Sequence, residues 1–573
     1  MMEITLHGLD IAIQETGCRI RLDGDMLSLD DTSWFEIYLE DGKRYTSADL
    51  NTTICQDSSG LFTLCHHSSD GLVQVRTCLY RENTEIRISH DVCFQWPDTP
   101  QRAWLALPWL SSLFLRNGRI FYPAMTQAKQ DGRDAMQHQD AYPLPLRLVR
   151  EDGSGIAVHS DLCAPGLTWD SLRNQELGNI SNARELHDLH FPIKANGRLT
   201  RIVQLALEPF TGGDRGFWDL MRRRLRANVD FSQYQREDLQ WFSKVKLFHF
   251  AYAYSRECFD YEKGRFDMPR LLAQGTAFGG YDAVLIWHQY PRLGIDSRDQ
   301  WDFFNAFPGG IRALREAVDY AHSKGVYVLL PYKPWDRTPS DSDEIVAHKL
   351  TALIRATDVD GIFLDTMHTL PASFRSAADS AKPGVVFVSE GTPQVKPALE
   401  TLTASWDQYW NDVAMPETPL IRYLFPEHVQ CAIARWHVGR QKDIAIQRAL
   451  FNGCGMVIWQ DIFGEWLPYN AAQQERIREL KDLLHTYADC FEGKPTPLIE
   501  TNNPQVFANL FEGLESAVLC VYNQQSEAVK AMITLPCQQV RTVTPNVQVE
   551  LIGKEIAVSL PAQTCALLSL VLE

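Results

Sequence analysis

The sequence predicts a multidomain protein with an N-terminal β-sandwich, a central (β/α)8 TIM barrel and a small C-terminal β-sandwich. Its 573 residues exceed the usual size of one domain. Both ends of the chain contain short apolar stretches separated by turn residues, whereas the middle alternates apolar strands with amphipathic helices. Hydrophobic residues make up 45% and charged residues 22%. This composition is typical of globular proteins and excludes disordered and fibrous classes.

The N-terminal β-sandwich is predicted for residues 1–212. Stretches such as 72–80 and 86–92 are apolar or alternate between apolar and polar, and Asp-Gly, Asn-Gly and Ser-Gly turns separate such stretches. Apolar residues then recur at nearly helical spacing at the start of the next segment. We therefore expect residues 213–243 to form a helical connector.

The barrel is predicted for residues 244–492. Its candidate strands are continuously apolar, as expected of strands that are buried on both faces. They are residues 247–252, 283–287, 326–330, 362–364, 385–388, 405–409, a weak strand after Leu420, and 456–459. Eight strand-helix repeats in about 250 residues match the usual size of a (β/α)8 barrel. No Gly-x-Gly-x-x-Gly turn follows any of these strands to favour a dinucleotide-binding fold.

The chain returns to short strands over residues 493–573, which predicts the C-terminal sandwich. Stretches such as 517–521 and 565–572 are apolar and lie between turn residues.

Charge and composition exclude several partners. The net charge of −17 repels phosphate backbones and anionic lipid surfaces, so we expect neither a nucleic acid nor a membrane as partner. The first 15 residues contain acidic side chains where an export signal would be basic and then apolar, and no apolar run approaches the ~18 residues of a membrane span. Thirteen cysteines without a Cys-x-x-Cys pair indicate reduced thiols. These features predict a cytoplasmic protein and leave its oligomeric state open.

Two carboxylates end neighbouring strands of the predicted barrel. Asp365 follows the fourth strand and Glu390 follows the fifth, and active sites of such barrels lie at the C-terminal ends of the strands. Adjacent strand ends are compatible with roughly 5 Å between the two carboxyl groups, the separation that a retaining glycosidase uses. One carboxylate would attack the anomeric carbon, and the other would hold a proton for the leaving group. A single strand-end aspartate can also cap a helix or brace a loop.

Other polar and aromatic residues lie at the same strand ends and are candidates for substrate binding. Flat indole rings can stack on sugar faces, and the polar groups can bind hydroxyls. His288 can instead brace a loop, Lys333 and Asp336 can pair with each other, and Asp461 can fix the last loop. The complete predicted set is Trp287, His288, Lys333, Trp335, Asp336, Trp406, Asp407, Trp459, Gln460 and Asp461.

Short motifs resemble those of retaining α-glycosidases. Asp360-Gly-Ile-Phe-Leu-Asp365-Thr-Met is similar to the fourth-strand nucleophile motif of the endo-α-N-acetylgalactosaminidase, α-galactosidase and α-amylase superfamilies. Val386-Phe-Val-Ser-Glu390-Gly resembles the fifth-strand acid/base motif of the first and third, and Gly310 to Tyr332 resembles the segment leading into strand three. The resemblance implies that Asp365 is the nucleophile and Glu390 the general acid/base.

One departure narrows the resemblance. Enzymes of the α-amylase type carry an arginine two positions before the nucleophile, where this chain has Phe363. The departure favours the N-acetylgalactosaminidase-like branch. By analogy the substrate would be an α-linked galactose-type or N-acetylhexosamine-type sugar in an oligosaccharide or small glycoside. The resemblance implies no metal or organic cofactor.

Two other functions fit parts of the pattern. Asp365, Glu390 and Asp407 on consecutive strands could ligate Mg²⁺ in an enolase-type lyase, with Lys333 as the catalytic lysine. A barrel without activity could also serve as a carbohydrate-binding protein. The lyase hypothesis gives no role to the flanking β regions, and the binding-protein hypothesis gives no role to the paired carboxylates.

Overall fold

The structure of the chain is a computed structural model. The residues that it describes are 2–27, 32–39, 42–95, 103–111, 118–122, 126–127, 146–150, 152–159, 190–193, 197–288, 298–338, 340–367, 369–393, 396–408, 419–434 and 440–573. The chain divides into two compact units, Met1–Arg223 and Arg224–Glu573.

Antiparallel sheets make up the first unit. One sheet contains β1 (Met2–Leu6), β2 (Leu9–Ile13), β3 (Gly17–Leu22), β4 (Asp25–Met26) and β5 (Thr32–Ser33). A nine-stranded sheet has the order β14 (Thr126–Gln127), β13 (Gly118–Tyr122), β15 (Leu146–Arg150), β16 (Gly155–His159), β18 (Thr200–Phe210), β11 (Glu85–Phe94), β10 (Val73–Glu82), β9 (Phe62–His67) and β8 (Asn51–Gln56). A third sheet has the order β17 (His190–Ile193), β12 (Ala103–Ala106), β6 (Glu36–Leu39) and β7 (Arg44–Thr46), and α1 (Pro108–Ser111) follows β12.

Alternating side chains give the nine-stranded sheet two different faces. Ile86 and Ile88 of β11 and Leu205 and Leu207 of β18 belong to one apolar core cluster, which includes residues from all three sheets. The residues between them point to the opposite face, because side chains alternate along a strand. The predicted helix after this sheet is confirmed as α4 (Gly213–Asn228).

The second unit contains the predicted barrel, and its closure is confirmed. Eight parallel strands pair in chain order, and the last pairs with the first. They are β19 (Leu247–Tyr252), β22 (Ala283–Trp287), β23 (Tyr327–Tyr332), β24 (Gly361–Leu364), β25 (Val386–Ser389), β26 (Ala404–Gln408), β27 (Val429–Ile433) and β28 (Gly455–Trp459). The weak seventh strand is β27, and the short helix α11 (Leu420–Leu424) precedes it.

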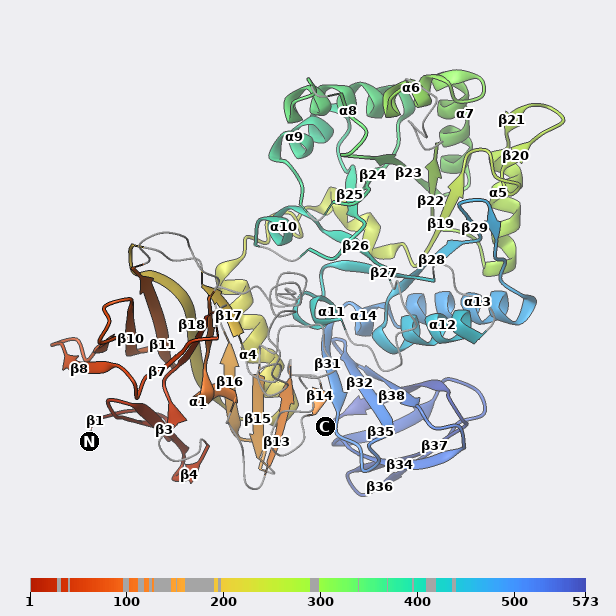
Figure 1. Ribbon diagram of the computed structural model, residues 1–573. Helices are drawn as coiled ribbons and strands as arrows, with labels where there is room; N and C mark the ends of the chain where they lie inside the picture. The colour runs from red at the N-terminus through yellow and green to blue at the C-terminus, as the bar shows by residue number, and fades with distance from the viewer. Residues whose placement is uncertain are drawn as a thin grey trace. The chain divides into compact units, whose positions relative to one another are not determined.

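Helices surround the barrel strands (Figure 1). They are α5 (Met268–Gly275), η2 (Thr276–Phe278), α6 (Gln300–Asn305), α7 (Gly310–Ser323), α8 (Asp343–Thr357), α9 (Ala372–Ala381), α10 (Lys396–Thr401), α11, α12 (Arg440–Asn452), α13 (Ala471–Thr486) and α14 (Ala488–Phe491). In α7 the buried residues Leu314, Val318 and Ala321 recur at helical spacing. Two short hairpins, β20 (Phe259–Asp260) with β21 (Arg265–Phe266) and β29 (Asp461–Ile462) with β30 (Glu465–Trp466), also belong to this unit.

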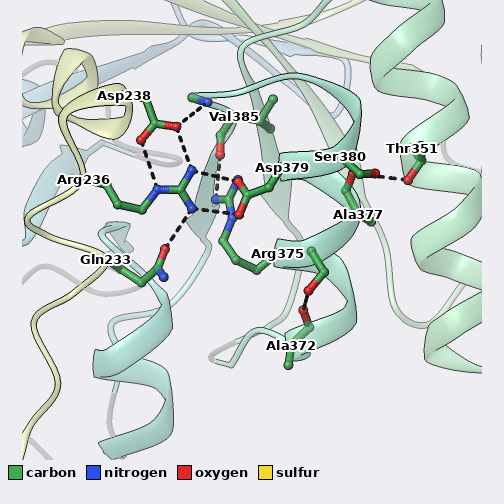
Figure 2. Close-up of polar contacts among 12 residues, drawn as sticks. Gln233, Arg236, Asp238, Thr351, Ala372, Arg375, Ala377, Asp379, Ser380 and Val385 are labelled. Carbon is green, nitrogen blue, oxygen red and sulfur yellow. Dashed lines mark hydrogen bonds and ion pairs between the residues drawn. The ribbon is translucent and has the colours of Figure 1, made fainter.

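The 3-10 helix η1 (Glu237–Lys244) precedes the first barrel strand and packs against the barrel interior. Its Leu239 and Phe242 belong to the same apolar cluster as the inward-facing strand residues. Arg236 donates to both carboxylate oxygens of Asp238 and to both of Asp379 on α9, at 2.7 to 3.0 Å (Figure 2). These hydrogen bonds connect the segment around η1 to an outer helix of the barrel.

The predicted C-terminal strands form two sheets around one apolar cluster. One sheet has the order β31 (Lys494–Ile499), β32 (Val506–Glu512), β33 (Ala517–Asn523), β38 (Cys565–Leu572) and β35 (Cys537–Thr542), and the other has the order β34 (Val529–Thr534), β37 (Glu555–Leu560) and β36 (Gln548–Ile552). Asn509 Nδ2 donates to the hydroxyl of Tyr423 on α11 at 2.7 Å. The sheets therefore contact the barrel helices directly.

Among the described residues, no helix combines the length and the apolar character that a bilayer crossing needs. The cysteines in the described part of the chain are free thiols, and most of them are buried.

Candidate active site

The two carboxylates singled out in the sequence lie side by side at the C-terminal edge of the barrel. Leu364 pairs with Ser389, so Asp365 and Glu390 are the next residues on adjacent strands β24 and β25. The backbone hydrogen bonds extend to these two residues, because Asp365 N donates to Tyr332 O at 2.9 Å and Glu390 N donates to Leu364 O at 3.1 Å. Each residue is therefore held by its N–H to the preceding barrel strand.

Burial and mutual repulsion hold one proton on the carboxylate pair. The Asp365 side chain is buried, with 6% of the residue exposed, and that of Glu390 is half-buried and within hydrogen-bonding distance of it. Burial, and then the charge and hydrogen bond of Glu390, raise the pKa of Asp365 to about 7. Lys333 and Trp335 act in the opposite direction and favour the ionised form of Asp365. Near neutral pH Asp365 therefore still binds its proton in a large fraction of the molecules.

Thr366 orients Glu390 through its backbone. Its N–H donates to Glu390 Oε2 at 2.6 Å. The φ of Thr366 is +55°, a left-handed conformation that a β-branched residue rarely adopts. Such strain tends to occur at functional sites. The sequence analysis missed this residue, because no local pattern indicates the conformation.

Trp335 presents an indole ring beside the carboxylate pair. Its Nε1 donates to Asp365 Oδ2 at 3.2 Å, and 46% of the residue is exposed. An exposed ring at this position can stack on a sugar face while its N–H stabilises the Asp365 carboxylate.

Lys333 lies in a buried polar cluster near Asp365. Its Nζ is 3.0 and 3.1 Å from the two ring nitrogens of His288 and 5.0 Å from the centroid of the Trp287 ring. Burial lowers the pKa of Lys333 to about 7, against the charges of Asp365 and Asp336, which raise it. The structure places Lys333, predicted to bind substrate or to pair with Asp336, near Asp365 with its ammonium group buried.

Gln300 holds the loop that contains Lys333 and Asp336, and the sequence analysis missed it. Its Nε2 donates to the carbonyl oxygens of Lys333 and Asp336, each at 2.7 Å, and its Oε1 accepts from Lys333 N at 2.9 Å. All three residues are fully buried. Gln300 begins α6, which follows a long connection after β22, so sequence spacing gives no indication of this contact.

Three predicted substrate-binding tryptophans lie in the apolar cluster inside the barrel. Trp287, Trp406 and Trp459 are only 1–3% exposed. Phe363, the residue in place of the amylase-type arginine, packs against Trp406 with ring centroids 4.1 Å apart and against Trp287 at 5.8 Å. An arginine here would introduce a charge into this aromatic cluster.

Gln460 and Asp461 make structural contacts at the end of β28. Gln460 Nε2 donates to Glu257 Oε1 at 3.0 Å, and its Oε1 accepts from Tyr469 N at 3.1 Å. Asp461 Oδ1 accepts from Gly464 N at 2.9 Å within the β29–β30 hairpin. Of the predicted residues, Asp407 lies on β26, and its side chain is outside the described part of the structure.

The amino-acid sequence matches no protein-family model and no curated protein. Solved structures are similar in fold. The α-N-acetylgalactosaminidase of Bifidobacterium bifidum in complex with GalNAc is 11% identical, with a TM-score of 0.58 over 91% of this chain and 98% of that one. Its complex with Gal-NHAc-DNJ is 12% identical with a TM-score of 0.59 over the same shares. A β-arabinopyranosidase is 11% identical, with a TM-score of 0.46 and 98% of both chains covered.

The two complexes of the α-N-acetylgalactosaminidase share the fold of this chain. That fold is a closed barrel of eight parallel strands, accompanied by β-sheets before and after it in the chain.

Proposed function

We propose that the protein is a retaining α-glycoside hydrolase whose chemistry takes place in the barrel, residues 244–492. Asp365 is the nucleophile and Glu390 the general acid/base. The observation that carries the proposal is the pair of carboxyl groups at adjacent strand ends, where burial and Glu390 raise the pKa of Asp365. Retaining hydrolysis requires one ionised and one protonated carboxyl group flanking the scissile bond.

The surroundings support this assignment of roles. Trp335 N–H and the nearby Lys333 stabilise negative charge on Asp365, whereas Glu390 raises its pKa. A glycoside bound between the two carboxyl groups would separate them and remove the contribution of Glu390 to the raised pKa of Asp365. The proposed mechanism requires the proton to reside on Glu390 and the charge on Asp365 in that complex.

The reaction follows in two displacements. Asp365 attacks the anomeric carbon while Glu390 gives its proton to the departing glycosidic oxygen, which leaves a covalent glycosyl ester on Asp365. Glu390 then takes a proton from water, and that water attacks the same carbon and releases Asp365. The two inversions retain the anomeric configuration.

The proposed substrate is an α-linked galactose-type or N-acetylhexosamine-type sugar in an oligosaccharide or small glycoside. The fourth- and fifth-strand motifs resemble those of enzymes for such sugars. The solved structures that share the fold over 91% of the chain include an α-N-acetylgalactosaminidase bound to GalNAc. The exposed indole of Trp335 beside Asp365 can stack on the apolar face of a galactose-type ring.

A panel of p-nitrophenyl α- and β-glycosides in metal-free buffer tests the proposal. We expect one α-glycoside of the galactose or N-acetylgalactosamine type to be cleaved, and Asp365→Asn to lose at least about 10³-fold in kcat/KM. Asp319→Asn, which changes an exposed carboxylate on α7, should retain wild-type activity. Cleavage that requires added Mg²⁺, or an Asp365→Asn variant as active as the wild type, would contradict it.

The leaving group separates the role of Glu390 from that of Asp365. A 2,4-dinitrophenyl group departs without protonation, so Glu390→Gln should retain much more activity on its glycoside than on the p-nitrophenyl or a natural one. Asp365→Asn should be impaired on all three. Equal losses of the Glu390 variant on good and poor leaving groups would show that Glu390 is not the acid.

A further inference from the structure

The β29–β30 hairpin has an aromatic residue at a turn position that does not suit it. Ile462 pairs with Glu465, so Phe463 and Gly464 alone form the turn. Their φ angles are +51° and +92°. Positive φ at both residues of a two-residue turn is the mark of type I′, which favours Asn-Gly and Asp-Gly. A bulky side chain at the first position therefore costs free energy.

Two contacts fix this hairpin over the end of the barrel. Ile462 is 2% exposed and belongs to the apolar cluster inside the barrel. Trp459 Nε1 donates to Asp461 O at 2.8 Å, which ties the last residue of β28 to the first residue of the hairpin. The barrel strands are parallel, so the hairpin lies at the same end of the barrel as Asp365.

The ring of Phe463 contacts other aromatic rings at this end of the barrel and still faces solvent. Its centroid is 5.5 Å from that of Trp459 and 5.8 Å from that of Tyr252, the last residue of β19. Even so, 45% of Phe463 is exposed. An unfavourable backbone conformation that presents an exposed ring is expected where the ring has a function, because such strain is concentrated at ligand-binding sites.

Phe463 and Asp365 follow strands on opposite sides of the barrel. β28 is the fourth strand from β24 in both directions around the closed sheet. With neighbouring strands about 4.8 Å apart and tilted by about 36°, opposite strands of such a barrel lie roughly 15 Å apart. A substrate whose first sugar stacks on Trp335 beside Asp365 therefore reaches Phe463 with its second sugar.

We propose that Phe463 stacks on the sugar unit on the leaving-group side of the substrate. This inference rests on the glycosidase function proposed above and adds a specificity to it. The flat ring packs against the apolar face of a pyranose, a contact that a small leaving group does not provide. Phe463 therefore makes the enzyme select a disaccharide or a longer glycoside over a glycoside with a small leaving group.

Replacement by asparagine separates substrate binding from a structural role. Asparagine suits the first position of the turn, so Phe463→Asn should fold with a Tm close to that of the wild type. Its kcat/KM for a disaccharide should fall at least about tenfold, whereas that for a glycosyl fluoride with the same first sugar should stay within about twofold. The probes are galactose and N-acetylgalactosamine, each α-linked to galactose, and the two matching α-glycosyl fluorides.

Two further variants serve as controls. Phe463→Tyr retains an aromatic ring at the turn and should match the wild type on both kinds of substrate. Leu514→Asn changes a residue that is 92% exposed between β32 and β33, away from the barrel mouth, and should change neither value.

A binding measurement tests the same contact without turnover. In the Asp365→Asn variant, calorimetry compares each disaccharide with the methyl α-glycoside of its first sugar. Adding Phe463→Asn should weaken binding of the disaccharide at least about tenfold and leave that of the methyl glycoside within about twofold.

The outcomes distinguish this inference from the proposed function. Cleavage and binding of the disaccharide that do not depend on Phe463, or equal losses on the disaccharide and the smaller ligand, would overturn the inference alone. Phe463-dependent binding of a disaccharide that the wild type does not cleave would support the inference and contradict the proposed hydrolysis. A wild-type chain that neither binds nor cleaves any of these sugars would contradict both.

Discussion

At the scale of single residues, the shared proton of Asp365 and Glu390 sets the expected pH dependence of activity. The pair is active with one proton, and burial and Glu390 raise the pKa of Asp365 to about 7. We expect kcat/KM to fall as pH rises through about 7, because the pair then loses the proton that the leaving group needs. It should fall again in acid, when both carboxyl groups are protonated. A pH profile of kcat/KM between pH 4 and 9 measures both limbs.

Burial lowers the pKa of Lys333 to about 7 as well, so the titration of Lys333 would give the same fall in kcat/KM near pH 7. The Glu390→Gln variant distinguishes the two causes. A dinitrophenyl glycoside needs no acid, so for Glu390→Gln on this substrate the fall of kcat/KM near pH 7 should disappear. If the fall persists in this variant, it belongs to the titration of Lys333.

The same raised pKa predicts that Asp365 lowers the stability of the fold. The folded protein binds the proton of Asp365 more tightly than the unfolded chain does, so the free energy of unfolding falls as pH rises from about 4 to about 7, and the full loss is present above about pH 7. Asp365→Asn should therefore be more stable than the wild type at pH 8, by on the order of 1–3 kcal/mol. The difference should shrink toward pH 4, where the folded state keeps the carboxyl group protonated and only about half of the unfolded chains have lost the proton. Urea unfolding at the two pH values checks this, and a gain that is equal at both would contradict it.

The residues of the site differ in how far a sequence reveals them. Asp365 and Glu390 could be predicted, because each directly follows a short apolar strand. Thr366 could not, since its contact with Glu390 depends on an unusual backbone conformation. Trp406 is inside the barrel rather than exposed at its mouth, and the position of a residue at a strand end does not by itself distinguish the two.

At the scale of elements, the ion-pair network beside η1 contributes to stability. Hydrogen bonds from Arg236 lower the pKa of Asp238. Burial raises the pKa of Asp379, but the hydrogen bonds from Arg236 and Arg375 outweigh it, so the pKa of Asp379 is also lowered. The network therefore stabilises the fold above about pH 4, and this contribution is lost as pH falls through the lowered pKa values. Arg236→Gln should lose about 1–2 kcal/mol at pH 7, a figure that allows for partial exposure, and much less at pH 3.

A matched control for this prediction is Arg312→Gln on α7. Its partner Glu316 is one helical turn away, and both side chains are well exposed, so the change should cost almost nothing. Equal losses in the two variants at pH 7 would show that the network contributes no more than an ordinary surface pair.

The elements themselves were largely predictable because barrel strands are buried on both faces. The apolar run of β19 has the predicted bounds, and so does that of β22. The seventh strand was weak in the sequence because Gln430 interrupts the apolar pattern of β27 and the apolar residues just before it form α11. Local hydrophobicity alone could not separate the helix from the strand.

At the scale of the whole molecule, each unit is organised around its own apolar cluster or clusters. The first unit combines the core of its sheets with the polar cluster of Glu85, His159 and Glu208. That cluster could not be predicted from the sequence, because it depends on the register of strands more than a hundred residues apart. The second unit contains the barrel and the C-terminal sheets, and the fold of the chain is similar to that of a solved α-N-acetylgalactosaminidase over 91% of its length.

The central claim is that Asp365 forms a covalent bond to the sugar. The most direct test is to incubate the protein with a fluorinated glycosyl fluoride of the α-glycoside that it cleaves, which slows release of the intermediate, and to map the label by mass spectrometry. We predict one sugar per chain on the peptide that contains Asp365 and none in Asp365→Asn. A label on another carboxylate, or rapid turnover with inversion of the anomeric configuration and no label, would contradict the account.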